Sequence, residues 1–271
     1  MASTTSDSAA SVARWRQAQA GLTTLLLRDL RGLRRLIDPA RLQGTVPTWI
    51  EAVTALVGRY SEVAATLAAD FYDGERDAAS VSGSFTVPLA GAPLDDQVSN
   101  SLRWATKDLW PRDSAEATVA QLEPFDVRLD AAIVKADGAT QKLVADRGRA
   151  TLRQAVDEDP QAVAYARAAA LGACAFCRLM ASRGSVYKTA ASAGREVNER
   201  FAGDASVVKF HDNCHCAIVP VFRGQRFELS PQAARWDRIY REYAQGHPGD
   251  QLRLFRRALA EHDPNPLPGS N

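Results

Sequence analysis

The chain has 271 residues, of which 46% are hydrophobic and 24% charged, so its composition is that of a folded globular protein and excludes an extended disordered chain. The 33 lysine and arginine residues nearly balance 32 aspartate and glutamate residues, and the net charge of +1 excludes the strongly basic character of a dedicated nucleic-acid-binding protein. The first residues are small and polar, and no apolar run resembles a signal peptide or is long enough to span a bilayer. We therefore expect a chain that assembles in the cytosol.

The first predicted element is a long amphipathic helix. Apolar residues recur at steps of three and four from Val12 to Ile37, which places them on one helical face. Five arginines accompany this face: Arg28, Arg31, Arg34, Arg35 and Arg41. We interpret them as a solvated surface, with contact to nucleic acid or to an acidic partner as the alternative.

A second helix is predicted to begin near Thr48. Thr48 and Glu51 have the spacing of a capping box, and Pro47 precedes them. Apolar residues then continue at helical period to Phe71, and Gly74 is the predicted end. Two long helices with a short break between them predict a helical hairpin.

The middle of the chain is predicted to be a loop followed by further helices. The stretch 79–97 is rich in Gly, Ser and Pro, which predicts a loop and an internal boundary. Helical patterning resumes near Asp96, stops at Pro111, and returns in the alanine-rich stretch 114–156. Asp159 and Pro160 are then placed like an N-cap and a first helical residue, which predicts another helix that ends near Gly184.

Beyond Gly184 the pattern changes to short strands. Segments rich in β-branched and aromatic residues, among them "AIVPVF" (Ala217–Phe222), predict a small β-hairpin region. Helical patterning returns from Trp236 to Leu259, before a proline-rich, loose tail. The predicted fold class is therefore mainly α, with a long N-terminal helical hairpin, further helices and a small β-hairpin region. We predict three regions: 1–95, 96–222 and 223–271.

All four cysteines lie between positions 174 and 216, and two histidines interleave with the second pair. The first pair, Cys174 and Cys177, has the pattern C-x2-C. After a gap of 33 residues comes the pattern H-x2-C-H-C, formed by His211, Cys214, His215 and Cys216. The first pair is predicted near the end of a helix, where positions i and i+3 share one face. The second group is predicted at the entry to a strand.

This spacing predicts a structural zinc site. Tetrahedral zinc takes four nitrogen or sulfur ligands, commonly four cysteines or three cysteines and one histidine. The candidate ligands are Cys174, Cys177, His211, Cys214 and Cys216, so an all-cysteine set and a set that contains His211 both remain open. In a strand His215 would point away from its neighbours, and we rank it last.

Other kinds of cysteine site fit less well. A disulfide framework belongs to secreted, cysteine-dense domains. A thioredoxin-type CxxC follows a strand and opens a helix, whereas this pair is predicted to close one. The motifs of zinc deaminases, zincins, P-loops and GxSxG hydrolases are absent from the sequence. Idle or redox-labile thiols and a catalytic centre remain as alternatives to a structural zinc clip.

The combined motif resembles that of a known family. The segment "CAFCRLMASRGSVYKTA", a gap of some twenty residues, and then "FHDNCHCAIVPVF" resemble the Mu F-type minor head proteins of tailed phages. The matching residues are Cys174, Cys177, Gly184, Val186, Tyr187, His211, Cys214, Cys216, Pro220 and Val221. The likeness extends over residues 140–222, and the first ninety and last fifty residues carry no matching motif.

The resemblance implies a structural protein of the virion that acts in head morphogenesis. It implies a location in the capsid interior near the portal, several copies per virion, and the portal protein and major capsid protein as partners, with packaged DNA as a further candidate. Some proteins of that family are regarded as capsid maturation proteases. No protease residues are recognisable in this sequence, so we expect a non-enzymatic role, with a maturation protease or another zinc-dependent hydrolase as the alternative.

Overall fold

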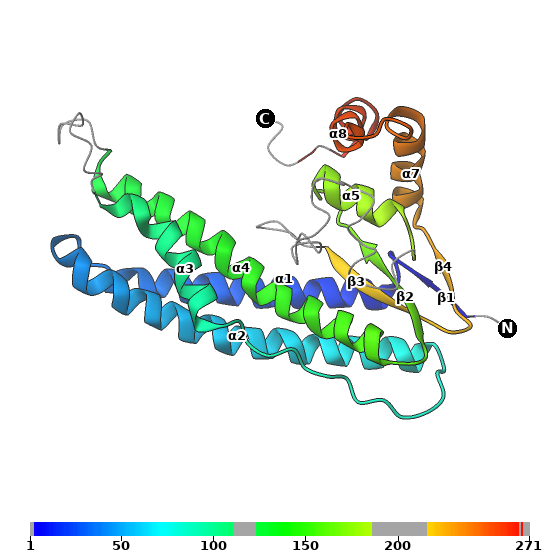
Figure 1. Ribbon diagram of the computed structural model, residues 1–271, viewed down its shortest axis with the longest axis horizontal. Helices are drawn as coiled ribbons and strands as arrows, with labels where there is room; N and C mark the ends of the chain where they lie inside the picture. Colours follow the sequence, from blue (N-terminus) through cyan, green and yellow to red (C-terminus); the bar gives the residue numbers. More distant parts are fainter. Residues whose placement is uncertain (1–2, 111–122, 186–215, 266, 268–271) are drawn as a thin grey trace.

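The computed structural model describes residues 3–110, 123–185, 216–265 and 267. This part of the chain is mainly helical, as predicted, and has a long helical body with a smaller strand-containing end (Figure 1). The helices are α1 (Ala10–Leu33), α2 (Leu42–Ala78), α3 (Asp95–Thr106), α4 (Phe125–Glu158), α5 (Ala175–Ser182), α7 (Pro231–Tyr243) and α8 (Gln251–His262). The strands are β1 (Thr4–Ser6), β2 (Ala162–Ala168), β3 (Ala217–Phe222) and β4 (Arg226–Glu228).

The predicted N-terminal hairpin is formed by α1 and α2, but the predicted start of α2 is wrong. The helix begins at Leu42, so Pro47 lies inside it. The hydroxyl of Thr48 donates a hydrogen bond to the Gly44 carbonyl oxygen at 3.3 Å, as side chains inside a helix do, and does not cap the helix. At the other end, Gly74 does not stop α2, which continues to Ala78.

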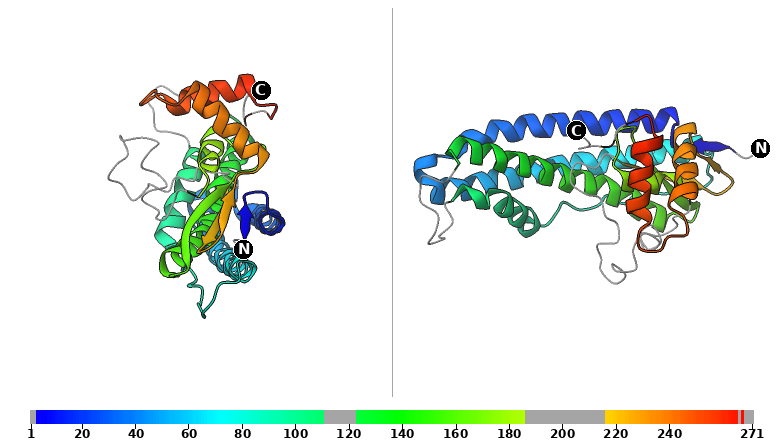
Figure 2. Two further views of the ribbon diagram at one scale, coloured as in Figure 1. Left: turned by 90° about the vertical axis from the view of Figure 1, so that its right-hand side faces the viewer. Right: turned by 90° about the horizontal axis from the view of Figure 1, so that it is seen from above.

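The body of the molecule is a bundle of α1, α2, α3 and α4. Its buried side chains form a cluster that we call the bundle core, which includes Leu26, Leu30, Trp49, Val53, Leu102 and Ile133. Helices α2 and α4 approach each other closely at Gly148, where an added Cβ would lie 3.1 Å from the Ala64 carbonyl oxygen. The long helices run lengthwise beside one another, whereas α7 and α8 are stacked at one end (Figure 2).

The predicted helix over residues 160–184 is wrong. This stretch forms strand β2, then a turn, and then the short helix α5. The Asp159 carboxylate does not cap a helix; instead it accepts hydrogen bonds from the backbone N–H of Gln161, the Tyr72 hydroxyl and the Arg76 guanidinium, which secure the turn from α4 into β2. Alanine favours helices intrinsically, but here pairing with β3 outweighs that preference.

Two small sheets bring distant parts of the chain together. Strand β2 pairs with β3 in antiparallel register, from Ala162 opposite Phe222 to Ala168 opposite Ala217. The segment Ala217–Phe222 is thus a strand, as predicted, and its partner is β2; the other expected hairpin segments lie outside the described residues. Strand β1, near the N-terminus, pairs in parallel with β4, so the beginning of the chain lies beside its C-terminal third.

A second apolar cluster, which we call the end core, joins these sheets to the surrounding helices. It includes Trp15, Tyr72, Phe222, Trp236 and Phe255, together with Ala-rich parts of β2 and α5. The predicted C-terminal helices are present as α7 and α8. No helix in the described ranges is both long and apolar enough to cross a membrane.

Candidate functional site

The C-x2-C pair lies at the start of α5, which corrects its predicted place at the end of a helix. Cys174 is the N-cap residue of α5, and its Sγ accepts a hydrogen bond from the Cys177 backbone N–H at 3.5 Å. Cys177 is buried and Cys174 is half-buried. A helix N-terminus and a donated N–H both favour a thiolate over a neutral thiol, and the thiolate is the form that binds metals.

Cys216, which is far from the C-x2-C pair in the sequence, packs in the same apolar cluster. It directly precedes β3, is 1% exposed, and belongs with Cys177 to the end core, at whose edge Cys174 packs. Its carbonyl oxygen accepts a hydrogen bond from Arg149 Nε at 3.4 Å. Arg16 of α1 also faces Cys216: burial lowers the pKa of Arg16, while the charges of Cys216 and Asp7 act in the opposite direction.

Three of the five predicted zinc ligands, Cys174, Cys177 and Cys216, therefore lie in the end core or at its edge. The other two, His211 and Cys214, and the disfavoured His215 lie outside the described residues. Within the described ranges, no three His, Cys, Asp or Glu side chains gather closely enough to hold a metal ion. The zinc site remains a prediction.

The place of the C-x2-C pair in the fold removes one argument against a redox role for these cysteines. The sequence predicted that the C-x2-C pair closes a helix, but the pair follows β2 and opens α5. That is the position of a redox-active pair in a strand–helix unit. A structural zinc site and a reversible thiol–disulfide pair must therefore be separated by experiment.

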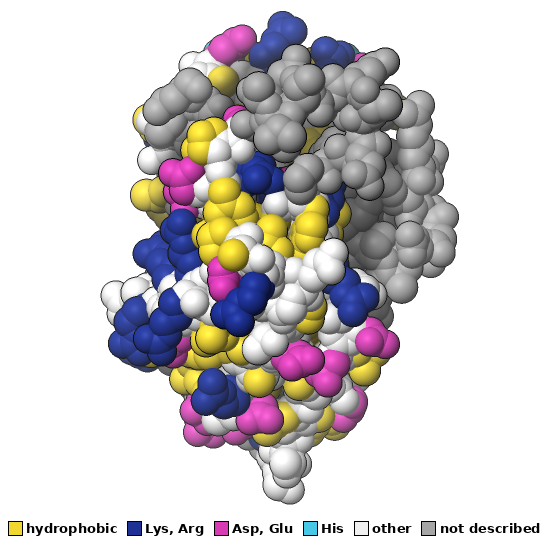
Figure 3. Space-filling model, turned by 90° about the vertical axis from the view of Figure 1, so that its left-hand side faces the viewer, with side chains coloured by type: hydrophobic (Ala, Val, Ile, Leu, Met, Phe, Trp, Pro, Cys, Tyr) yellow, Lys and Arg dark blue, Asp and Glu magenta, His cyan; other side chains and the backbone are white. Residues whose placement is uncertain are grey.

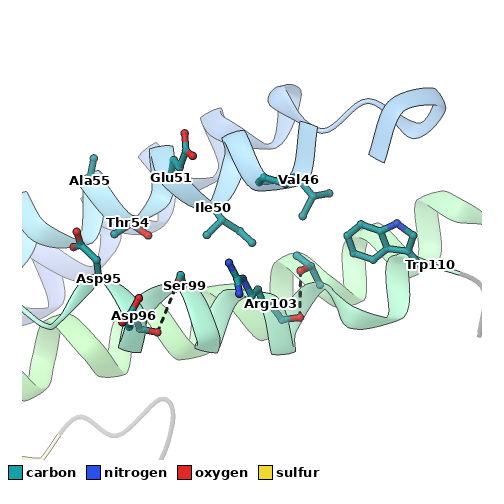
Figure 4. Close-up of a pocket in the computed structure, with 12 residues that line it drawn as sticks. Val46, Ile50, Glu51, Thr54, Ala55, Asp95, Asp96, Ser99, Arg103 and Trp110 are labelled. Carbon is teal, nitrogen blue, oxygen red and sulfur yellow. Dashed lines mark hydrogen bonds between the residues drawn. The ribbon is translucent and has the colours of Figure 1, made fainter. Parts of the chain in front are cut away.

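A surface feature that the sequence did not predict is a groove between α2 and α3. The groove has a volume of ≈ 670 Å³, and its apolar wall includes Val46, Pro47, Ile50 and Trp110 (Figure 4). Because Pro47 lacks an N–H, the Gln43 carbonyl one turn earlier has no helical donor from this position.

Charged side chains line the same groove. Glu51 of α2 and Asp95 and Asp96 of α3 lie toward one end, where Asp95 stands beside Thr54 and Ala55, whereas Trp110 lies toward Val46 at the other end (Figure 4). Arg103 lies between these ends. In the described part of the chain no salt bridge joins Glu51, Asp95, Asp96 or Arg103 to another charged group. The groove thus has an apolar end and an end with three carboxylates, with Arg103 between them.

Fold and site together define a mainly helical chain with a cysteine-bearing, strand-containing end. Comparison with known sequences gives its family: the VG15 protein family matches residues 6–245, and the chain belongs to it. The chain is also 28% identical over 185 residues to the "Gene 15 protein" of Mycobacterium phage D29. That alignment covers 60% of this chain and 62% of the relative, which is less than two thirds of the relative's length.

No solved structure matches the chain. The predicted relation to bacteriophage proteins is confirmed at the level of the family and its phage relative. The Mu F-type assignment stays a prediction.

Proposed function

We propose that this chain is a structural minor head protein of a tailed bacteriophage, which lies in the capsid interior near the portal and acts in head morphogenesis. The observation that carries the proposal is the family match over residues 6–245, together with a relative encoded by a phage. The partners we propose are the portal protein and the major capsid protein.

The shape of the molecule supports such a role. Helix α2 alone has 37 residues, which corresponds to about 55 Å of helix. Two buried cores along this length hold the body as a rod with separate surfaces at each end. A rod of this kind suits a component that connects other proteins within an assembly.

The test is the composition of purified phage particles. We expect mass spectrometry to find the chain in mature virions, in far fewer copies than the major capsid protein, and cross-linking to join it to the portal. Deletion of its gene is expected to reduce the yield of DNA-filled heads. A chain that is absent from virions and from head intermediates would refute the proposal.

We also propose that the cysteine-bearing end binds one structural zinc ion. The proposal is supported by the position of Cys174, Cys177 and Cys216 in or beside the end core and by the N–H···S contact at the start of α5, which favours the thiolate form that zinc requires. Cys214 or His211 would complete the set of four. The ion would tie α5 to the entry of β3 and add its binding free energy to that of folding.

Metal analysis of the purified chain tests the zinc proposal. We expect one zinc per chain, and we expect a chelator or the Cys177→Ser change to lower the melting temperature and release the metal. Cys177→Ser alone could act through packing, so Cys174→Ser, at a half-buried position, serves as the second variant. A zinc-free chain that forms a Cys174–Cys177 disulfide reversibly under mild oxidants would replace the zinc proposal with the redox one.

A further inference from the structure

We propose that the groove between α2 and α3 is a self-association site, which receives the exposed face of α1 from a second copy of this chain. The proposal concerns how copies contact one another, and it stands independently of the virion role. Its basis is the match between the acidic and apolar lining of the groove and the arginines and leucine exposed on α1.

A ligand complementary to the groove would have cationic groups at one end and apolar groups at the other. Its acidic end has three carboxylates, Glu51, Asp95 and Asp96, all on exposed residues. Its apolar end is formed by Val46, Pro47 and Trp110. From Val46 to Ala55 the groove follows about 14 Å of α2, which corresponds to between two and three helical turns.

The exposed face of α1 carries arginines next to an exposed leucine. Its residues are Leu25, Arg28, Arg31 and Gly32, and the exposed Arg35 and Leu36 follow in a 3-10 turn (Arg34–Leu36) directly after the helix. Arg28 is paired with Asp29 at 2.9 Å, which leaves Arg31 and Arg35 to meet the acidic end of the groove. Leu25 is 44% exposed. With Leu25 at the apolar end of the groove, Arg31 lies about 9 Å further along α1, within the length of the groove.

Gly32 lies on this face, and its open surroundings are shared by Gly21, Gly44, Gly58 and Gly74. A glycine inside an exposed helix costs about 1 kcal/mol relative to alanine. A Cβ at Gly32 would meet nothing within 4 Å, so packing within one copy does not require glycine there. A helix from another molecule could approach α1 closely at this position.

The two surfaces belong to different elements, the groove to α2 and α3 and the other surface to α1 and the turn after it. In the view from one end, Lys and Arg side chains are scattered over the visible face with a group at the left, and Asp and Glu side chains are most frequent in its lower half (Figure 3). An interface between two different surfaces is heterologous, so each copy can bind one neighbour through α1 and another through the groove. Such contacts close into a ring or extend into a filament.

The experiment measures the mass of the full chain by light scattering and by sedimentation, over a range of protein and salt concentrations. We expect the wild type to associate as its concentration rises, and to dissociate as salt screens the charges. A groove variant (Glu51→Lys with Asp96→Lys) and an α1 variant (Arg31→Glu with Arg35→Glu) should each weaken association roughly tenfold or more. Mixed together in equal amounts, the two variants should associate again, because the reversed charges pair with each other and each unchanged surface meets its unchanged partner.

Matched controls separate association from folding. Arg238→Glu with Arg256→Glu makes the same charge change on α7 and α8, and it should leave association unchanged. Gly32→Leu should block association without lowering the melting temperature, whereas Gly74→Leu, at another exposed helical glycine, should not. A wild type that stays monomeric at every concentration, or variants that remain monomeric when mixed, would overturn the proposal.

Discussion

Asp263 connects three elements at the cysteine-bearing end through one buried carboxylate. It is paired with Arg178 of α5 at 3.0 Å, accepts a hydrogen bond from the Trp236 indole of α7, and directly follows α8. The side chains of both Arg178 and Asp263 are completely buried. Two charges inside a core are tolerated only as a pair, so the loss of either leaves the other without compensation.

We therefore predict that Asp263→Ala destabilises the chain strongly. The loss of the carboxylate that balances the charge of Arg178 and the lost indole hydrogen bond should together cost about 3–5 kcal/mol, as measured by urea unfolding. The double change Arg178→Met with Asp263→Leu removes both charges and should cost less, although it also removes the hydrogen bonds that Arg178 donates to the carbonyl oxygens of Leu171, Ala173 and Asn265. A double variant as unstable as the single one would show that these hydrogen bonds and packing, and not the charge, dominate at this site.

The same carboxylate predicts a dependence on acid. Burial raises the pKa of Asp263, but hydrogen bonds from Asn265 and Trp236 and the charge of Arg178 outweigh it and lower the pKa overall. A depressed pKa contributes stability that is present above the unfolded value, near 3.9, and is lost as pH falls through the lower folded value. The melting temperature should thus fall below about pH 4, and Asp263→Asn should flatten that fall relative to the wild type.

For the buried Glu75 we predict the opposite dependence of stability on pH. This residue of α2 is 4% exposed, and burial raises its pKa, although hydrogen bonds from Ser11 and Thr5 act against the shift. A raised carboxyl pKa means that the folded state binds the proton more tightly, so stability rises as pH falls through the folded value. Glu75→Gln should therefore raise the melting temperature at pH 7–8 and change it little near pH 4. The exposed Glu62→Gln is the control, and equal effects of the two changes would contradict the prediction.

At the scale of elements, the close contact of α2 with α4 depends on Gly148. Its Cβ would lie 3.1 Å from the Ala64 carbonyl oxygen, and this backbone atom cannot turn aside as a flexible side chain can. Gly148→Val should force α4 away from α2 and cost about 1–3 kcal/mol by thermal unfolding. The control is Gly58→Ala in α2: its Cβ would meet nothing, so it should stabilise by about 0.5–1 kcal/mol. A harmless Gly148→Val would show that the two helices are not tightly packed there.

The long helices could be predicted because their apolar residues repeat over many turns. Their ends could not, since Thr48 and Glu51 have capping-box spacing inside a helix that begins six residues before Thr48. The strand β2 was missed because "AVAYARA" is rich in alanine, and its pairing with β3 depends on residues some fifty positions further on. Non-local pairing of this kind leaves no periodic signal in one short segment.

The candidate sites were predictable to different degrees. The cysteines could be found from spacing alone, because metal ligands must be of a few residue types. Their local structure was predicted wrongly, with the C-x2-C pair at the wrong end of a helix. The groove could not be found, because Glu51 and Asp95 are separated by the loop and meet only when α3 folds back along α2.

At the scale of the whole molecule, the bundle core and the end core are connected by continuous helices. Helix α1 contributes Leu26 and Leu30 to the bundle core and Val12 and Trp15 to the end core. Helices α2 and α4 are likewise divided between the cores. A helix that is already ordered at one end extends at little further cost, because nucleation is the unfavourable step. The two cores should therefore gain and lose order together.

We predict that a destabilising substitution in one core lowers the stability of both cores. Leu102→Ala in α3 removes a fully buried side chain from the bundle core, and Phe255→Ala in α8 does the same in the end core. Each change should cost about 2–5 kcal/mol, and hydrogen exchange should show protection lost to a similar extent in β3 and in the middle of α2 for both variants. If Leu102→Ala instead accelerates exchange only in the bundle, the cores unfold as separate units. The long helices would then be able to fray at one end while the cysteine-bearing end stays folded.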